Sequence, residues 1–378
     1  MLVRIIFASL ALLSLILLLW QWWVARRFPL HQRLEARSFA PGVTLLKPLK
    51  GSDETIEAGL RSWFTQVYPA EMQLLFGVAA ANDPVCAVVK KLIEQFPKLD
   101  ARLVVCGPLM GTNLKVSKLA QLEHEARHEI FVVSDADVKV PPDFLANVVA
   151  PLQNPNVGLV NCFYQLANPT TLAMRWEAIA INADFWSQVL QSRSLKPLDF
   201  ALGAVMAFRS RELKEIGGFS ALADCLADDY QLGHRIAQRG RQIALSPLVV
   251  ECWSAPMSWS QVWKHQLRWA RTIRVCQPLP YFFSILSNAT LWPLLCLLAW
   301  PTALTLGLVL TCLSARIAAG SDLQWRLTKV PPRFTDAGFI ILKDLLQALI
   351  WFLAFLGNRI EWRGESFRLR RDGTLVKV

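Results

Sequence analysis

Paired cysteines are missing from this chain. It contains eight cysteines, but none forms a C-x-x-C pair and their spacing is irregular. Two of them, Cys296 and Cys312, lie inside an apolar stretch. The pattern argues against a disulfide framework and against a zinc site, and reduced thiols in the cytoplasm explain it more simply.

The common nucleotide-binding signatures are also absent. No G-x-G-x-x-G string follows the first predicted strand, and no G-x-x-x-x-G-K-[ST] string occurs. A Rossmann-type cofactor site and a P-loop are therefore disfavoured. The sequence shows no internal repeat with a period of roughly 20 to 50 residues.

Acidic residues are fewer than basic ones, 29 against 40, which leaves a formal net charge of +11. Such an excess can indicate nucleic-acid binding. Here, however, many basic residues flank apolar segments, where they favour membrane orientation and contact with anionic lipid. We therefore expect a lipid bilayer as partner and no nucleic acid. The flanking residues are Arg26, Arg27, Arg33, Arg37, Arg359, Arg363, Arg368, Arg370 and Arg371.

The N-terminal segment from Ile5 to Val24 is almost entirely apolar and ends in tryptophans, followed by Arg26 and Arg27. About 20 helical residues span a hydrocarbon core of roughly 30 Å. A cleaved signal peptide would carry its basic residues before the apolar run and a small-residue cleavage site after it. The opposite charge order predicts a retained anchor with its arginines on the cytoplasmic side.

The C-terminal third contains further apolar segments. The range 282–317 is long enough for two crossings with a turn near Pro301, and 339–356 is a third candidate that carries Lys343 and Asp344. Ionisable groups within a span usually face protein or water. The basic tail and the middle domain should lie on the same side, which requires an even number of crossings between them. Two alternatives remain: the third segment is re-entrant or interfacial, or the tail lies outside.

The middle of the chain alternates between strand-like and helix-like segments. This order predicts an α/β domain with a mainly parallel sheet covered by helices, whose ligands lie beyond the carboxyl ends of the strands. We expect an anchor over 1–25, a catalytic domain over 38–280, membrane helices over 281–357 and a basic tail over 358–378. The predicted strands are 43–46, 74–79, 102–105 and 130–134, and the predicted helices are 53–65, 85–95, 114–126 and 142–149.

Two carboxylates, Asp135 and Asp137, directly follow the buried strand in the string IFVVSDADVKV. Carboxylate oxygens suit Mg²⁺ or Mn²⁺, and such an ion can bridge a diphosphate. The metal would neutralise the charge that develops when a nucleotide diphosphate departs. A solvated turn is the alternative interpretation of this pair.

Other acidic residues lie at comparable positions. Asp83 follows the second strand, where it either forms a turn before Pro84 or contacts the nucleotide. Asp228 and Asp229 precede a helical pattern and could simply stabilise a helix N-terminus. An aspartate beside an acceptor hydroxyl could instead act as a general base, as an inverting displacement requires.

A basic and tryptophan-rich segment, WKHQLRWARTIR, precedes the second apolar region. An interfacial helix is one explanation for it. In the other, His265 and Arg268 contact the sugar diphosphate while Trp269 stacks on sugar or lipid.

Taken together and in chain order, these strings resemble the ceramide glucosyltransferases of glycosyltransferase family 21 and their bacterial hopanoid-glycosylating relatives. The resemblance covers roughly residues 40–280 and the layout of the apolar segments. The strings that carry it are LLKPLKGSD (45–53), NDP (82–84), TNLKVSKL (112–119), VVSDADVKV (132–140), GAVMAFR (203–209), LADDY (226–230) and HQLRWART (265–272).

The resemblance implies a glycosyltransferase A-type fold, a mixed and mostly parallel sheet with helices on both faces, together with N- and C-terminal transmembrane helices. It also implies an inverting mechanism. On the matching positions, Asp83 would lie near the nucleotide, Asp135 and Asp137 would bind the metal and the diphosphate, and Asp229 would be the base.

Arg268 and Trp269 match the end of the family motif Q/R-x-x-R-W, which implies contact with the diphosphate and the acceptor. His265 departs from the first position of that motif and makes the charge there depend on pH. This departure leaves a hopanoid acceptor open beside ceramide. Lys115 is a further candidate for holding phosphates, although a solvated helix face explains it almost as well.

We therefore expect a multi-pass enzyme of a bacterial inner membrane, with its catalytic domain on the cytoplasmic side. It would transfer a sugar from a UDP-sugar donor to the hydroxyl of a membrane lipid, giving glucosylceramide from ceramide or a glycosylated bacteriohopanetetrol-type hopanoid. One alternative is a processive polysaccharide synthase of the cellulose or hyaluronan kind. The other is a non-catalytic basic membrane scaffold.

Overall fold

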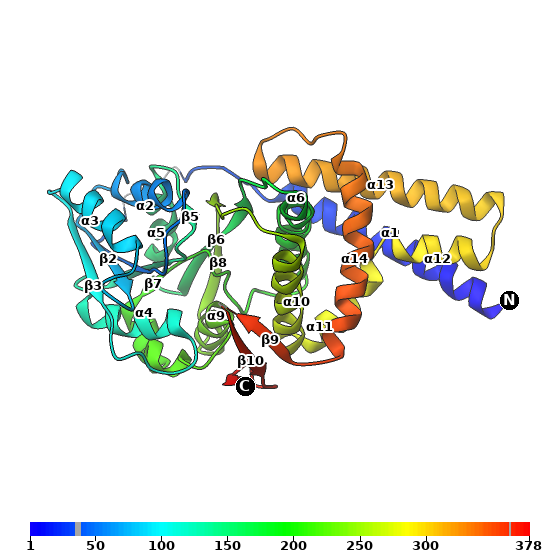
Figure 1. Cartoon of the computed structure of the whole chain (residues 1–378). Helices are drawn as coiled ribbons and strands as arrows, with labels where there is room; N and C mark the ends of the chain where they lie inside the picture. The colour runs from blue at the N-terminus through cyan, green and yellow to red at the C-terminus, as the bar shows by residue number, and fades with distance from the viewer. Residues whose placement is uncertain (35–38, 363) are drawn as a thin grey trace.

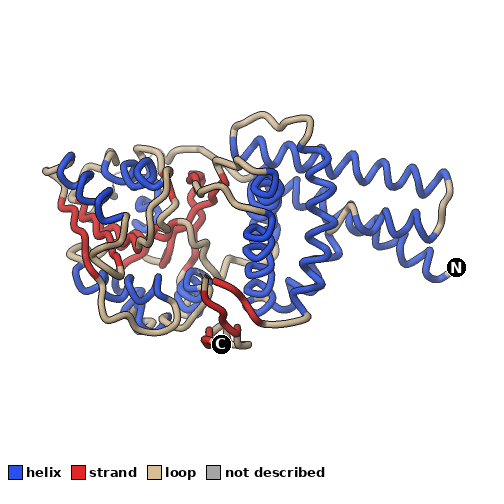
Figure 2. Tube along the Cα trace, viewed as in Figure 1, coloured by secondary structure: helices blue, strands red, loops and turns tan. Residues whose placement is uncertain are grey.

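The computed structural model describes residues 1–34, 39–362 and 364–378. Two flanking arginines, Arg37 and Arg363, and the first residue of the expected catalytic domain lie outside the described residues. Figure 1 shows a domain of strands and helices at one end and a group of long helices, which includes the N-terminus, at the other. Figure 2 separates the two parts by secondary structure, with nearly all strands in the first.

An eight-stranded sheet organises the α/β domain in the order β3-β2-β1-β4-β7-β6-β8-β5. Neighbours among β3, β2, β1 and β4 are parallel, β7 runs antiparallel to both β4 and β6, and β5 is antiparallel to β8. The expected mixed, mostly parallel sheet is therefore confirmed. The strands are β1 Val43–Pro48, β2 Met72–Val78, β3 Asp100–Val105, β4 Ile130–Ser134, β5 Val138–Lys139, β6 Val157–Leu166, β7 Val205–Arg209 and β8 Gln242–Cys252.

Helices cover both faces of this sheet, because its central strands are apolar on both sides. In β1, Leu45 packs into one core and Leu46 into the other, as expected when successive side chains point to opposite faces. Such strands occur where both faces are covered. The helices of the domain are α2 Ile56–Phe64, α3 Val85–Gln95, α4 Leu114–Glu125, α5 Phe144–Val149, α6 Leu172–Ile179, α7 Trp186–Arg193, α8 Ser210–Glu215, α9 Asp228–Gln238 and α10 Trp259–Cys276.

Most elements predicted from the sequence are confirmed. Helix α3 and strand β4 have the predicted bounds. The helix predicted to start at Pro142 instead begins at Phe144, after Asp143 at its N-cap position. A π-helical segment, Ala180–Phe185, joins α6 to α7, and short 3-10 helices occupy Ala150–Gln153 and Phe219–Leu222.

Three helices in the described part of the chain are long and apolar enough to cross a membrane: α1 Leu2–Arg27, α13 Ala303–Thr328 and α14 Asp336–Phe355. A fourth possible span consists of two helical halves. The first half, 278–287, comprises α11 Pro278–Phe283 and the 3-10 helix Ser284–Ser287, and the second half is α12 Leu291–Ala299. This pair is bent by 56°. The expected turn near Pro301 is present between α12 and α13, but the first of the two expected crossings is broken rather than straight.

The residues that we described from the sequence as a basic tail form a second, three-stranded antiparallel sheet. Its strands are β9 Arg359–Trp362, β10 Glu365–Leu369 and β11 Leu375–Lys377. Leu226, from the loop before α9, shares a small core with Ile360, Phe367, Leu369 and Leu375. The tail is therefore attached to the α/β domain.

Candidate active site

The turn after β4 carries Asp135 and Asp137 and is fixed by hydrogen bonds from both sides. The amide of Asp135 donates to the carbonyl of Ala204 at 3.2 Å. From β1, the ammonium of Lys47 donates to the hydroxyl of Ser134 at 3.1 Å and to the carbonyl of Asp135. Lys47 is fully buried, a position that lysine occupies only when its charge has partners. Lys47 thus fixes the backbone that presents the two carboxylates.

Lys115 joins this turn to the acidic pair at the start of α9. Its ammonium lies 2.8 Å from Oδ1 of Asp135 and 3.0 Å from Oδ2 of Asp228. Asn113 positions the lysine, because its side chain caps α4 by accepting from the amides of Lys115 and Val116. The same side chain donates to the carbonyl of Cys225 at 2.7 Å. The string TNLK therefore connects α4 with the loop that leads to α9.

Asp229 packs against the start of β7. A Cβ added to Gly203 would lie 2.6 Å from Oδ2 of Asp229, so the carboxylate occupies the space that a side chain would need. The next residue, Ala204, is the one that accepts the hydrogen bond from Asp135. The segment Gly203–Ala204 thus contacts both Asp229 and the turn after β4. Three of the predicted site residues, Asp135, Asp229 and Lys115, therefore belong to one cluster.

Burial and mutual repulsion perturb the carboxylates of this cluster. Burial, and then the charge of Asp228, raise the pKa of Asp229 to about 6, although Lys115 opposes the shift. Burial and Asp135 raise the pKa of Asp137 to about 6 against the effect of Lys47. Burial alone would lower the pKa of Lys115, but the surrounding carboxylates outweigh it and raise that pKa. A carboxyl group poised near neutral pH is suited to exchange protons.

Asp83 serves as a turn residue in this structure. Its two carboxylate oxygens accept from the amide of Gly51 at 3.0 and 3.1 Å, and Oδ1 also accepts from the amide of Val85. Gly51 has a φ of +71°, which glycine adopts without strain. These bonds join the loops that follow β1 and β2, at the same edge of the sheet as Asp135. The predicted contact of Asp83 with a nucleotide remains a prediction.

The residues predicted on α10 point in different directions. His265 lies 2.6 Å from Oε1 of Glu177, and its ring is 4.5 Å from that of Trp269 between centroids. The ring centroid of Trp269 also lies 6.3 Å from that of Phe185, which is in turn 5.5 Å from that of Tyr164 in β6. Arg268 instead lines a hollow beside Arg359 of the C-terminal sheet. The sequence analysis missed Glu177, whose only signal was an isolated acid in the apolar string LAMRWEAI.

A divalent cation fits the carboxylates after β4. In the described part of the chain, no group of three or more His, Cys, Asp or Glu side chains is arranged to hold a metal. Mg²⁺ and Mn²⁺ at phosphate sites need only one or two protein carboxylates, since water and substrate phosphates complete the shell. Asp135 and Asp137 provide such a pair. After burial, the charge of Asp135 is the next cause of the raised pKa of Asp137, and a bound cation would relieve this repulsion.

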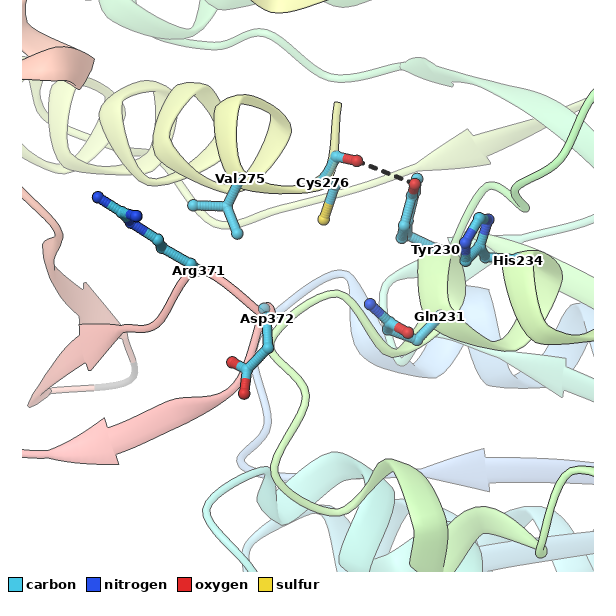
Figure 3. A pocket seen from close by; sticks show the side chains of 8 residues that line it. Tyr230, Gln231, His234, Val275, Cys276, Arg371 and Asp372 are labelled. Atoms are coloured by element: carbon cyan, nitrogen blue, oxygen red, sulfur yellow. Dashed lines mark hydrogen bonds between the residues drawn. The ribbon is translucent and has the colours of Figure 1, made fainter. Parts of the chain in front are cut away.

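The C-terminal sheet lies against the loop that precedes Asp228. The amide of Leu226 donates to the carbonyl of Gly373 at 3.2 Å, and the amide of Leu375 donates to that of Asp224 at 2.8 Å. Figure 3 shows the tail turn facing α9 and the end of α10 across a cavity of about 160 Å³. On the opposite wall, the hydroxyl of Tyr230 donates to the carbonyl of Cys276 at 3.0 Å.

Comparison with known proteins places these features in a wider context. The model of the family "Glycosyl transferase family 21" matches residues 6–375. Ceramide glucosyltransferase 3 of Caenorhabditis elegans is 23% identical over 93% of this chain and 77% of its own length. Ceramide glucosyltransferase 1 of the same organism is 25% identical over 58% of this chain and 47% of its own length.

Among solved structures, a mannosyltransferase from Pyrobaculum calidifontis, in complex with GDP-Man and Mn2+, is similar to this chain with a TM-score of 0.56. The two are 22% identical, and the match covers 94% of this chain and 98% of that one. The likeness confirms the glycosyltransferase A-type fold.

Proposed function

This chain belongs to glycosyl transferase family 21, and on that basis we propose that it transfers a sugar from a UDP-sugar to the hydroxyl of a membrane lipid. The acceptor is ceramide, giving glucosylceramide, or a bacteriohopanetetrol-type hopanoid. The similarity to two ceramide glucosyltransferases supports a lipid acceptor. Because His265 departs from the first position of the family motif Q/R-x-x-R-W, a hopanoid remains an alternative acceptor.

One observation carries the proposal. Lys115 bridges Asp135, which follows β4, and Asp228, which begins α9, so carboxylates more than 90 residues apart in the chain meet at one point. A scaffold without catalytic activity would not need carboxylates from distant segments gathered at this point, with the pKa of Asp229 beside them raised to about 6. A donor site and a base placed side by side explain the arrangement.

In the proposed mechanism Asp229 takes the proton from the acceptor hydroxyl as its oxygen forms a bond to the anomeric carbon. The bond from that carbon to the diphosphate breaks in the same step, which inverts the configuration. A divalent cation held by Asp135 and Asp137 would stabilise the negative charge on the departing UDP. Lys115, next to Asp135, adds a positive charge on the side where the phosphates bind.

We also propose that the catalytic domain lies on the cytoplasmic side, with α1 and the segment 278–328 inserted in the membrane. The tail sheet contacts the loop at Leu226, so an even number of crossings must separate the tail from the domain. In Figure 1, α14 runs across the direction of α1, α12 and α13 and beside α10. The number of crossings is even when the bent pair and α13 each cross the membrane and α14 lies along the membrane surface.

The exposed face of α14 agrees with this placement. Lys343 and Asp344 are buried on its other side, where they form ion pairs with Asp184 and Arg316. Apolar side chains recur on the exposed face at intervals of three or four residues, the spacing of one face of a helix. These exposed residues are Leu342, Leu345, Leu349, Phe352 and Leu356.

The activity can be tested directly with purified membranes that contain the full chain. They are incubated with a panel of UDP-sugars and with ceramide or hopanoid, and the lipid fraction is measured by mass spectrometry. We expect one sugar per lipid, and a series of longer products would favour a polysaccharide synthase instead. Asp229→Asn keeps the size of the side chain and removes the base, so we expect transfer to fall by at least about a hundredfold.

A matched control is Asp100→Asn, which makes the same chemical change in a partly exposed ion pair of the edge strand β3. It should retain nearly full activity. Transfer at the original rate by the Asp229→Asn variant would refute the assignment of the base, and full activity with a chelator would refute the metal site.

A further inference from the structure

A basic hollow of about 260 Å³ lies between helix α10 and the C-terminal sheet. One wall is formed by the face of α10 that carries Lys264, Arg268 and Arg271, which are spaced four and three residues apart. The facing wall contains Arg359 at the start of β9. Apolar surface from Leu267 and Ile360 completes much of the lining.

The charges that line this hollow are not balanced. Among the described residues that line it, Glu361 is the one carboxylate, and it is already paired with Lys264 at 2.7 Å, while Arg271 and Arg359 add two further cations. Arg271 donates from Nη1 to the carbonyl of Arg359, whereas its buried Nε has no hydrogen-bond partner in the described part of the chain. The guanidinium groups of Arg271 and Arg359 therefore give this lining positive charge that suits an anion.

Exposed apolar side chains lie close to this hollow. Leu279 and Phe282 of α11 are 69% and 50% exposed, and Phe352 and Phe355 of α14 are 54% and 39% exposed. The rings of Phe282 and Phe355 are 6.3 Å apart, so the two helices present one apolar surface. Arg274, one turn along α10 from Arg271, lies 5.7 Å from the centre of the Phe355 ring. The basic hollow thus adjoins a surface suited to the acyl region of a bilayer.

We propose that this hollow binds the phosphate group of an anionic membrane lipid. The guanidinium forks of Arg271 and Arg359 match phosphate oxygens, while the acyl chains lie along the exposed apolar side chains of α11 and α14. Ceramide and hopanoid acceptors carry no phosphate, so this lipid is not the acceptor. The bound lipid would instead hold α10, α14 and the C-terminal sheet at the level of the headgroups.

The probe is dimyristoylphosphatidylglycerol added to the full-length protein in a neutral detergent, with bound lipids counted by native mass spectrometry. Phosphatidylcholine of the same chain length is the neutral comparison. We expect phosphatidylglycerol to be retained preferentially. The double variant Arg271→Gln and Arg359→Gln should weaken this retention by about tenfold or more, because each cation near the surface contributes to binding. Arg268 is left unchanged, since it is a candidate for the donor site.

A matched control is the double variant Arg368→Gln and Arg370→Gln, which removes the same charge from exposed positions in and just after β10, outside the lining. It should retain the lipid like the original chain. Sugar transfer and thermal unfolding in detergent show separately whether each variant is folded. Arg271→Lys, which keeps the charge, should recover part of the binding.

Three results would overturn the proposal. The first is equal retention of the anionic and neutral lipids. The second is equal weakening by both double variants, which would reflect net charge alone. The third is displacement of the lipid by UDP or by inorganic phosphate, which would make the hollow a donor or free-phosphate site. None of them depends on whether the chain transfers sugar to ceramide or hopanoid.

Discussion

Lys115 determines how charge is shared among the carboxylates of the candidate site. Because it contacts both Asp135 and Asp228, it keeps two acidic segments together that would otherwise repel each other. Asp229 lies beside this contact and retains a raised pKa of about 6. Its protonation state is therefore sensitive to the charge of its immediate neighbours.

The pH dependence of transfer should report this sensitivity. Because the base must be deprotonated, kcat/KM should fall by about tenfold for each pH unit below 6. Asp228→Asn removes the neighbouring negative charge that raises the pKa of Asp229, so the acidic limb should move to lower pH. The measurement is kcat/KM from pH 4.5 to 8 for both proteins.

A second group, Asp137, also has a pKa raised to about 6. A metal at saturating concentration keeps that carboxylate ionised, so the profiles should be recorded with excess Mn²⁺ or Mg²⁺. If kcat/KM of the Asp228→Asn variant falls at the same acidic pH as that of the original chain, the titrating group is not Asp229.

At the scale of elements, the C-terminal sheet positions the loop before α9. Hydrogen bonds from Leu226 to Gly373 and from Leu375 to Asp224 fix this loop on one side. Asn113 holds it on the other through the carbonyl of Cys225. Asp229, the proposed base, follows three residues after Leu226, so displacement of the sheet should displace it.

Leu375→Asp tests this coupling. Leu375 is 3% exposed and lies in the core shared with Leu226, where an unpaired carboxylate is strongly unfavourable. We expect kcat to fall by at least about tenfold while UDP binding changes little, because the turn after β4 is untouched. Kinetics and UDP titration separate the two effects.

Val378→Asp is the control, because it introduces the same charge at a side chain that is 63% exposed. Limited proteolysis shows whether the sheet is released. A released sheet with unchanged kcat would show that the loop holds its position without it.

At the scale of the whole molecule, the attachment of the tail to the catalytic domain restricts the topology. Three apolar segments separate the two, and all three cannot cross while both ends remain on one side. In Figure 1, α14 runs across the direction of α1, α12 and α13, and we therefore propose that it is the segment that stays at the membrane surface. The turn around Pro301 then lies on the far side.

Labelling with a membrane-impermeant maleimide tests this arrangement in intact bacterial spheroplasts. We expect Thr302→Cys, in the turn before α13, to react from outside, and Arg370→Cys, in the tail, to react only after permeabilisation. The original chain, with its own cysteines, provides the background. Reaction of both variants from outside would place the tail outside and contradict the proposal.

Local patterns were sufficient to predict most helices and strands. Helix α3 and strand β4 match their predicted bounds because periodicity and apolar runs report on neighbouring residues. The motif strings were likewise enough to indicate the family and the acidic site. They could not show the antiparallel insertion of β7, because strand direction depends on partners distant in the chain.

What only the tertiary structure decided concerns contacts between distant segments. Lys47 beneath Asp135, Glu177 beside His265 and the tail sheet against Leu226 each join residues more than 80 positions apart. The sequence alone does not distinguish Lys47 from the other basic residues, 40 in total, and it indicates only that the tail is charged. Burial and partners give these residues their roles, since an ionic group can be buried only where the fold places its counterpart.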